Sequence, residues 1–347
     1  MKYKLEKVRY MRKPDFKNIL KVLKNKKPER PTLFEFFLNQ PLYQKLTVEE
    51  DINTEGEMGQ LRLIIHAFKN AGYDYVTLHG SDFFFPVEES HSLESISLNE
   101  GTVIANEEDF KNYSWPDPET YDYSRLEKIK DELPAGMKVI VYGPGGVLEN
   151  VIGLVGYESL CYMIKDKPEL VEAIFEAVGS RLVKYYDICG KYDVAGALIS
   201  NDDWGFKTQT MLSTEDMKKY VFPWHKKIVE TIHKYDKPAI LHSCGNLEEV
   251  MEDVIWEMKY DAKHSFEDNI IPVEKAYRKW GDEIAILGGI DVNFICQSDT
   301  KKIKERSRNM LKISEDKGGY ALGTGNSVPE YVPDDKYLAM ISVIKEK

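Results

Sequence analysis

The sequence predicts an α/β fold, a single (β/α)8 barrel of the TIM type that extends over residues 1–347. Apolar runs of strand length alternate with stretches of helical periodicity, and neither an internal repeat nor a low-complexity linker divides them. Eight such runs with helices between them favour a closed barrel over a doubly wound open sheet, which is the main alternative. The expected strands are 32–36, 75–78, 138–142, 194–199, 239–241, 261–265, 284–287 and 320–322.

The helices expected between these strands carry apolar residues at intervals of three and four. One of them starts at Ser213-Thr214-Glu215-Asp216, a sequence that resembles a capping box. We expect residues 80–135 to form an elaborated connection between the second and third strands. The expected helices are 57–70, 168–190, 214–235, 246–260, 272–280 and 299–317.

Composition and charge restrict the class of protein. The formal net charge of −11 argues against nucleic acid as a partner, because phosphate binding needs an excess of lysine and arginine. No run is apolar enough to cross a membrane, and the charged start MKYKLEKVRYMRKPDF lacks the apolar core of a signal peptide. We therefore expect a cytoplasmic protein. Its four cysteines are few and widely spaced, which does not suggest a disulfide framework.

Polar residues follow strand after strand, at the end where a barrel carries its reactive groups. For Asp202 and Asp203 the simpler interpretation is that they cap the next turn, and Glu267 could be a solvated loop carboxylate. Together, seven polar strand ends predict a functional site at this end of the barrel. The residues at these ends are His79 and Asp82, Gly143-Pro144-Gly145-Gly146, Asn201-Asp202-Asp203, His242 and Cys244, Glu267 and Asp268, Gly288-Gly289-Ile290-Asp291, and Gly323-Thr324-Gly325-Asn326-Ser327.

His242 and Cys244 end the fifth expected strand and carry the most specific chemistry. Residues two apart on an extended chain point the same way, so the imidazole and the thiol can face one point in space. Asn246 then caps the following helical stretch. A nitrogen and sulfur pair in this position suits a catalytic zinc ion. The alternative is a buried cysteine beside a hydrogen-bonded histidine.

A catalytic zinc site needs three protein ligands and one open position. Glu267 follows the next strand, and neighbouring strands of a barrel lie close together, so we predict that Glu267 is the third ligand or a ligand that leaves when substrate arrives. Such a zinc ion could hold a substrate thiol as thiolate or polarise an oxygen atom as a Lewis acid.

Several motifs in chain order resemble the uroporphyrinogen decarboxylase superfamily. The resemblance extends over roughly residues 15 to 345 and implies a (β/α)8 barrel. The motifs are Lys24-Asn25-Lys26-Lys27-Pro28-Glu29-Arg30, Gly72-Tyr73-Asp74 with Asp82, Trp115-Pro116-Asp117-Pro118, Leu241-His242-Ser243-Cys244-Gly245-Asn246, Leu287-Gly288-Gly289-Ile290-Asp291 and Leu322-Gly323-Thr324-Gly325-Asn326.

The chain departs from the decarboxylases of this superfamily. Those enzymes bind a tetrapyrrole through arginines in an Arg-Gln-Ala-Gly-Arg motif, whereas residues 34–40 contain no arginine. They also carry a histidine where this chain has Thr324 and a tyrosine after the third strand that is not matched, and only Asp82 is retained. A substrate with eight carboxylates would be poorly held without those cations.

The resemblance is stronger to the cobalamin-dependent methyltransferases, such as methylcobamide:coenzyme M methyltransferases. Their zinc-binding His-x-Cys corresponds to His242 and Cys244, and Glu267 matches the position of a glutamate that can reach the zinc. The second cysteine usual near the eighth strand is missing from residues 321–327. One thiolate fewer leaves more positive charge on the metal, which favours Lewis-acid activation of a substrate oxygen or thiol.

The resemblance therefore implies a zinc-dependent methyltransferase that moves a methyl group between a small substrate and a corrinoid protein. The chain has no Asp-x-His-x-x-Gly corrinoid motif, so the corrinoid would come from a separate partner protein. The small partner would be a methylated substrate or a thiol acceptor, with Asp82, Asp202 and Asp203 shaping its side of the pocket. Two alternatives stay open: a uroporphyrinogen decarboxylase-like enzyme, and a non-catalytic barrel that binds a small ligand.

Overall fold

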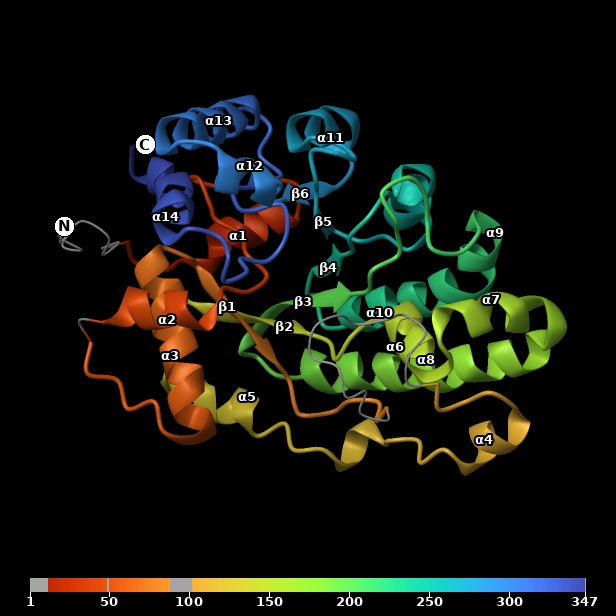
Figure 1. The fold of residues 1–347 in the computed structure, drawn as a ribbon. Helices are drawn as coiled ribbons and strands as arrows, with labels where there is room; N and C mark the ends of the chain where they lie inside the picture. The colour runs from red at the N-terminus through yellow and green to blue at the C-terminus, as the bar shows by residue number, and fades with distance from the viewer. Residues whose placement is uncertain (1–11, 49, 88–101, 347) are drawn as a thin grey trace.

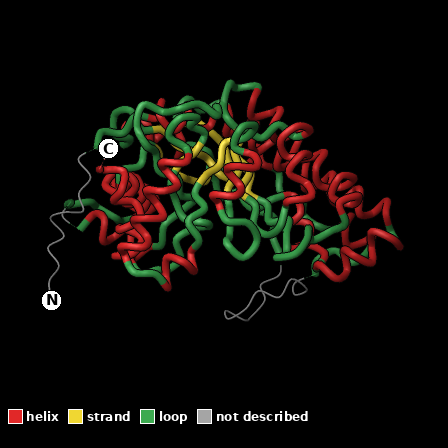
Figure 2. Tube along the Cα trace, turned by 90° about the horizontal axis from the view of Figure 1, so that it is seen from above, coloured by secondary structure: helices red, strands yellow, loops and turns green. Residues whose placement is uncertain are grey.

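The computed structural model describes residues 12–48, 50–87 and 102–346. Seven parallel strands form one sheet, in which the spatial order β1 to β7 is also the order along the chain. Helices surround this sheet, which lies at the centre of the molecule (Figures 1 and 2). The strands are β1 (Tyr75–His79), β2 (Lys138–Tyr142), β3 (Ala195–Asn201), β4 (Ala239–His242), β5 (Ala262–His264), β6 (Ala285–Leu287) and β7 (Tyr320–Ala321).

Most of the expected helices are present, and α8 has the expected bounds. The α-helices are α1 (Phe16–Leu23), α2 (Gln40–Thr47), α3 (Gly56–Ala71), α4 (Glu107–Asn112), α5 (Arg125–Lys128), α6 (Val147–Val155), α7 (Tyr157–Asp166), α8 (Pro168–Gly190), α9 (Thr214–Asp216), α10 (Phe222–His233), α11 (Val273–Trp280), α12 (Val292–Gln297), α13 (Thr300–Ile313) and α14 (Asp334–Ser342). The shorter elements are the 3₁₀-helices η2 (Pro118–Thr120), η3 (Ile129–Asp131), η5 (Glu248–Val250) and η7 (Val343–Glu346), and the π-helices η4 (Met217–Val221) and η6 (Asp253–Glu257).

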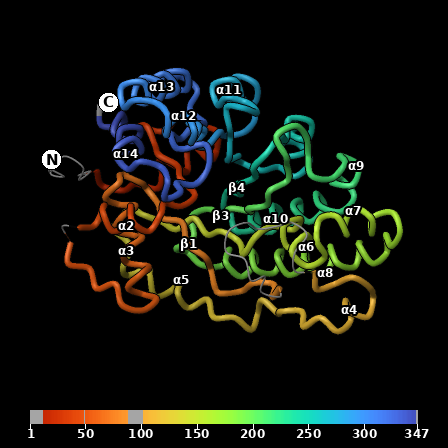
Figure 3. The backbone as a smooth tube through the Cα atoms, in the orientation of Figure 1, coloured from red at the N-terminus to blue at the C-terminus, as the bar shows by residue number. Residues whose placement is uncertain are grey.

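The predicted parallel α/β architecture is confirmed, but the predicted closed barrel of eight strands is not, because the sheet of the described residues has seven strands and the predicted first strand is not formed as a strand. Residues 32–36 pair through a single parallel bridge between Leu33 and Leu322. On their other side, the side-chain hydroxyl of Tyr75 bonds the backbone of Glu35, accepting from its N–H and donating to its carbonyl. The side chain of Tyr75 thus takes up the backbone hydrogen bonds of Glu35. This prevents regular strand pairing between residues 32–36 and β1. Figure 3 shows this N-terminal segment beside the C-terminal helices.

Two expected helices differ in detail. The stretch 214–235 is helical as α9, η4 and α10, and its π-helical turn precedes Pro223. Proline has no N–H to donate to the carbonyl of Lys219, so the regular α-helical bond between these residues cannot form. The stretch 246–260 was expected to be one α-helix and is instead a 3₁₀ turn followed by the π-helix η6. Apolar spacing does not separate these types of helix here, because each element is only about one turn long.

The elaborated connection after β1 contains α4, η2, α5 and η3, and it runs along the lower edge of the molecule in Figure 1. Residues 88–101 of this connection lie outside the described residues. Among the described helices, no single one has the length and apolar character needed to cross a membrane; the bent pair of α6 and α7 meets that test only when the two are taken together.

The strand registers bring the polar strand ends together. Asn201 at the end of β3 pairs with His242 at the end of β4, and His242 pairs with His264 at the end of β5. Because all seven strands are parallel, the loops that follow them meet at one side of the sheet, here called the carboxyl-end face. The polar ends of β3, β4 and β5 therefore lie side by side at this face.

Candidate functional site

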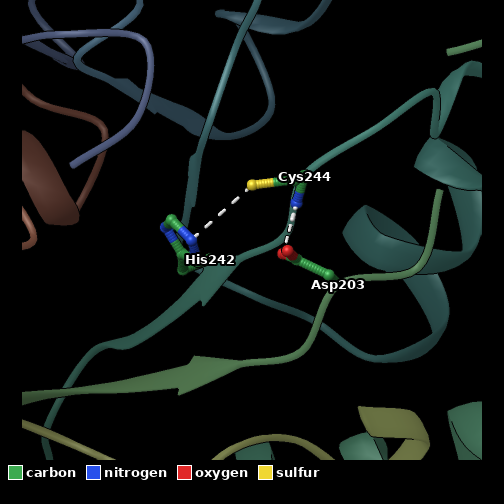
Figure 4. Close-up of side chains that lie close together, drawn as sticks. All are labelled: Asp203, His242 and Cys244. Atoms are coloured by element: carbon green, nitrogen blue, oxygen red, sulfur yellow. Dashed lines mark hydrogen bonds between the residues drawn. The ribbon is translucent and has the colours of Figure 1, made fainter. Parts of the chain in front are cut away.

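The loop after β4 places Cys244 opposite His242. The sulfur of Cys244 lies 3.9 Å from Nε2 of His242, with the thiol directed toward the imidazole ring (Figure 4). The chain then turns at Gly245, whose φ is +86°. A Cβ at this position would stand 2.0 Å from the carbonyl oxygen of Gly205, so only glycine allows the two loops to approach so closely. The predicted convergence of His242 and Cys244 is confirmed.

Asp203 is the third member of this group. Its carboxylate accepts a hydrogen bond from the backbone N–H of Cys244 at 2.8 Å (Figure 4). Ligand atoms of Asp203, His242 and Cys244 all lie within 4.8 Å of one another. The backbone of Asp202 bonds the carbonyl of His242 at 2.9 Å, which holds the end of β3 beside the end of β4. The ends of the adjacent parallel strands β3 and β4 therefore bring these three side chains together.

Burial shifts the pKa values of all three side chains of this group. Burial, together with the nearby charge of Asp203, raises the pKa of the Cys244 thiol to about 12. Burial also raises the pKa of Asp203 and, with the neighbouring His264 and Lys263, holds the pKa of His242 well below its usual range. The environment thus disfavours charge on each side chain. A bound cation would reverse this preference for the thiol and the carboxyl, because it stabilises their anions. Sulfur, nitrogen and carboxylate oxygen are the donors that zinc takes in proteins, so this donor set fits a zinc ion.

Hydrogen-bond donors surround the sulfur atom. The hydroxyl of Ser265 and the side-chain amide of Asn326 donate to Sγ of Cys244 at 3.4 and 3.3 Å. Lys263 lies behind this loop, is only 3% exposed, and donates to the carbonyls of Ser243 and Ser265 at 3.3 and 2.5 Å. Burial lowers the pKa of Lys263 to about 8. The Ser265 hydroxyl and the charge of Lys263 lower the pKa of the Cys244 thiol, but burial and Asp203 outweigh them.

A cavity of about 1050 Å³ opens beside the group, over the loops that follow β5, β6 and β7. Asn326 lines this cavity and also bonds the sulfur of Cys244, so the cavity and the three-residue group share a wall. The lining carries three acids, Glu267, Asp268 and Asp291, and one lysine, Lys207. Exposed aromatic rings, among them Phe37 and Tyr331, complete the lining. The space is large enough for a small organic substrate.

Glu267 lies at this cavity, but it is not part of the three-residue group. Its carboxyl is half-buried, and burial together with the charge of Asp291 raises its pKa. The structure brings Asp203 to the position for which the sequence suggested Glu267. A role of Glu267 as a ligand or as a substrate contact stays a prediction.

Asp202 and Asp82 lie elsewhere. The buried carboxylate of Asp202 accepts from the backbone N–H groups of Leu148 and Glu149 at 2.9 Å and contacts Nε2 of His225 at 2.8 Å. It therefore caps the start of α6, close to the simpler interpretation of a capping aspartate. Asp82 is exposed and paired with Arg125 at 2.5 Å. Neither carboxylate lines the cavity, so a direct role for either in shaping the pocket has no support in their placement.

Three buried residues near the site were not expected from the sequence. His264 contacts His242, Glu35 accepts two hydrogen bonds from Thr324, and Lys263 lies behind Cys244. His264 could have been found, because it ends the expected strand beside that of His242. Glu35 gave no such signal, since it stands between phenylalanines in an apolar run.

Comparisons with known proteins agree with this architecture. Among solved structures, a methyltransferase from Methanosarcina mazei superposes with a TM-score of 0.72 at 14% identity, covering 95% of this chain and 97% of that one. A protein assigned as a vitamin-B12 independent methionine synthase from Listeria monocytogenes superposes with a TM-score of 0.53 at 13% identity, covering 92% and 98%. At such identities these likenesses establish a shared fold.

Sequence comparison identifies the family. A uroporphyrinogen decarboxylase from Anaeromyxobacter sp. (strain Fw109-5) is 21% identical over 220 residues, which are 62% of this chain and 59% of that protein. The chain thus spans less than two thirds of this relative. The sequence profile of the uroporphyrinogen decarboxylase (URO-D) family matches residues 63–347, most of the chain. The chain belongs to the uroporphyrinogen decarboxylase (URO-D) family.

Proposed function

We propose that this chain is a zinc-dependent methyltransferase that moves a methyl group between a small substrate and a corrinoid protein. The observation that carries the proposal is the group of Asp203, His242 and Cys244, whose ligand atoms lie within 4.8 Å of one another beside the cavity. The fold shared with the methyltransferase from Methanosarcina mazei supports it. Three ligands leave the fourth position of a tetrahedral ion for substrate.

Asp203, His242 and Cys244 would hold the zinc ion. When bound, it would supply Lewis-acid stabilisation for negative charge on the substrate atom that gains or loses the methyl group. Ser265 and Asn326 donate hydrogen bonds to the sulfur and draw electron density from it, which leaves the sulfur a weaker donor to the metal. This favours an oxygen or thiol substrate activated by a Lewis acid.

The cavity would bind the substrate and position it. Phe37 and Tyr331 offer apolar surface, while Glu267 presents a half-buried carboxyl with a raised pKa. Glu267 is thus placed to exchange a proton or a hydrogen bond with a substrate next to the proposed zinc site. The corrinoid, supplied by a separate protein at the carboxyl-end face, would carry the methyl group.

Membership of the URO-D family also supports a second candidate, decarboxylation of a porphyrinogen. The cavity argues against it, because its lining has three acids and one lysine, and no arginine among the described residues. A substrate with many carboxylates would be repelled by that lining.

Metal analysis is the first test. We expect about one zinc ion per chain in the wild type and little in Cys244→Ala, because a site that loses its only thiolate binds zinc weakly. Cys161→Ala is the matched control, since Cys161 is exposed on α7 and outside the group. Equal zinc in the wild type and Cys244→Ala would contradict the assignment.

Methyl transfer is the second test. Under anaerobic conditions, the absorption spectrum of added cob(I)alamin would be followed with methoxylated aromatic compounds, methylamines or methyl thioethers as donors. We expect formation of methylcobalamin with one class of donor, and its loss in His242→Ala but not in Cys161→Ala. Full-rate demethylation without any corrinoid, or equal rates in the wild type and His242→Ala, would overturn the proposed function.

A further inference from the structure

A second histidine stands behind the proposed zinc ligand. His264 at the end of β5 pairs in register with His242 at the end of β4, and their Nδ1 atoms lie 2.8 Å apart. Both side chains are buried: His264 is 0% exposed and His242 is 7% exposed. A contact this short between two ring nitrogens requires a proton on only one of them, since two N–H groups would collide.

The other ring nitrogen of His264 decides which Nδ1 carries that proton. Nε2 of His264 lies 3.2 Å from the carbonyl oxygen of Thr324, and a carbonyl oxygen can only accept. Nε2 of His264 therefore carries hydrogen. The carbonyl of Thr324 is itself held in place, because it also accepts a hydrogen bond from the backbone N–H of Gly289 at 2.8 Å.

A neutral His264 with hydrogen on Nε2 has a bare Nδ1, which must accept from Nδ1–H of His242. That leaves the lone pair free on Nε2 of His242, the nitrogen 3.9 Å from the sulfur of Cys244. The neutral state of His264 follows from its geometry. The ring is 0% exposed, and its hydrogen-bond partners among the described residues are the His242 ring and the Thr324 carbonyl, with no carboxylate to stabilise a positive charge. The contacts from the Thr324 carbonyl through His264 to His242 therefore assign each ring proton to one nitrogen.

We propose that His264 is a positioning residue that fixes His242 in its Nδ1–H tautomer and so presents a free lone pair on Nε2 to a metal ion. The metal rests on the proposed function, whereas the tautomer is a property of the chain without metal. Histidine ligands are generally oriented by such a partner on the second nitrogen, and loss of the partner costs about 10- to 100-fold in metal affinity. Here the partner is a second imidazole anchored on a backbone carbonyl.

The test is nitrogen NMR of the metal-free full chain with ¹⁵N-labelled histidine at pH 7.5. Long-range ¹⁵N–¹H spectra separate protonated from bare ring nitrogens, and single substitutions of His242 and His264 assign their signals among the seven histidines. We expect hydrogen on Nδ1 of His242 and on Nε2 of His264. Hydrogen on Nε2 of His242 in the wild type would overturn the proposal.

Two variants extend the test to zinc. His264→Phe keeps a ring but removes the acceptor, so we expect a mixture of His242 tautomers and a 10- to 100-fold lower zinc affinity, about the loss typical of such a partner. His264→Asn offers an amide oxygen near the position of Nδ1 and should restore most of both properties. A wild-type spectrum and affinity in His264→Phe would refute the role of His264. If the wild type shows the expected tautomer but binds no zinc, the tautomer stands and the proposed function fails.

Discussion

The carboxylate of Asp203 accepts the backbone N–H of Cys244 at 2.8 Å, which ties the end of β3 to the loop after β4. This single contact holds the oxygen ligand and the sulfur ligand of the proposed zinc site at a fixed separation. It also explains how a chain without a second cysteine near Thr324 still assembles three ligand atoms. The third donor comes from the strand before His242 rather than from the strand after it.

Asp203→Asn should weaken zinc binding by more than about tenfold, because the amide keeps the hydrogen bond to Cys244 but supplies no negative charge to the metal. Competition with a chromophoric chelator measures the affinity. Circular dichroism of the metal-free variant serves as the control for folding. Unchanged zinc affinity in Asp203→Asn would remove Asp203 from the ligand set.

Glu267→Gln should keep most of the zinc and raise the KM for the methyl donor, because Glu267 lies at the cavity and outside the group of ligand atoms. The pH profile of the rate should also change, since the variant lacks an acid whose pKa is raised by burial. Zinc analysis and steady-state kinetics test this directly. A loss of zinc as large as that in Asp203→Asn would make Glu267 a ligand as well.

Glu35→Gln should stabilise the protein at neutral pH. Burial raises the pKa of Glu35 from 4.5 to about 8, so between these values the folded chain retains a proton that the unfolded chain has released. The stability contributed by this group is therefore lost as pH rises from about 4.5 to 8. We expect Glu35→Gln to gain about 1–3 kcal/mol at pH 8 and nothing at pH 4.5.

Denaturant unfolding at both pH values checks the Glu35 prediction. Glu29→Gln is the matched control, because it makes the same chemical change at a side chain that is 75% exposed. A difference between wild type and Glu35→Gln that does not vary with pH would show that Glu35 ionises normally in the folded chain.

Uroporphyrinogen should not be decarboxylated by this chain. Residues 34–40 contain no arginine, Thr324 stands where the decarboxylases carry histidine, and the cavity lining is acidic. Chromatography of anaerobic reactions would detect coproporphyrinogen with high sensitivity, using an active decarboxylase as the positive control. Its formation at a rate above background would restore the decarboxylase as the leading function.

Local patterns in the sequence predicted a large part of the fold. The helix α8 was predicted at its observed bounds, because a proline start and a long periodic stretch are local signals. The strands from β1 to β7 were also located, since buried parallel strands are short apolar runs. The expected first strand, residues 32–36, does not form. Its pairing depends on whether its backbone bonds a neighbouring backbone or the Tyr75 side chain, and a local pattern does not show this.

The sequence by itself determined that the side chains of His242 and Cys244 face each other, because the spacing of two residues on an extended chain is a local relationship. Only the tertiary structure decided that Asp203 joins them while its neighbour Asp202 turns away to cap α6. Successive residues of an extended chain face opposite sides, and nothing local says which side holds the site. The contacts of His264 and Glu35 were likewise decided by tertiary structure, since they join segments 22 and 289 residues apart in the chain.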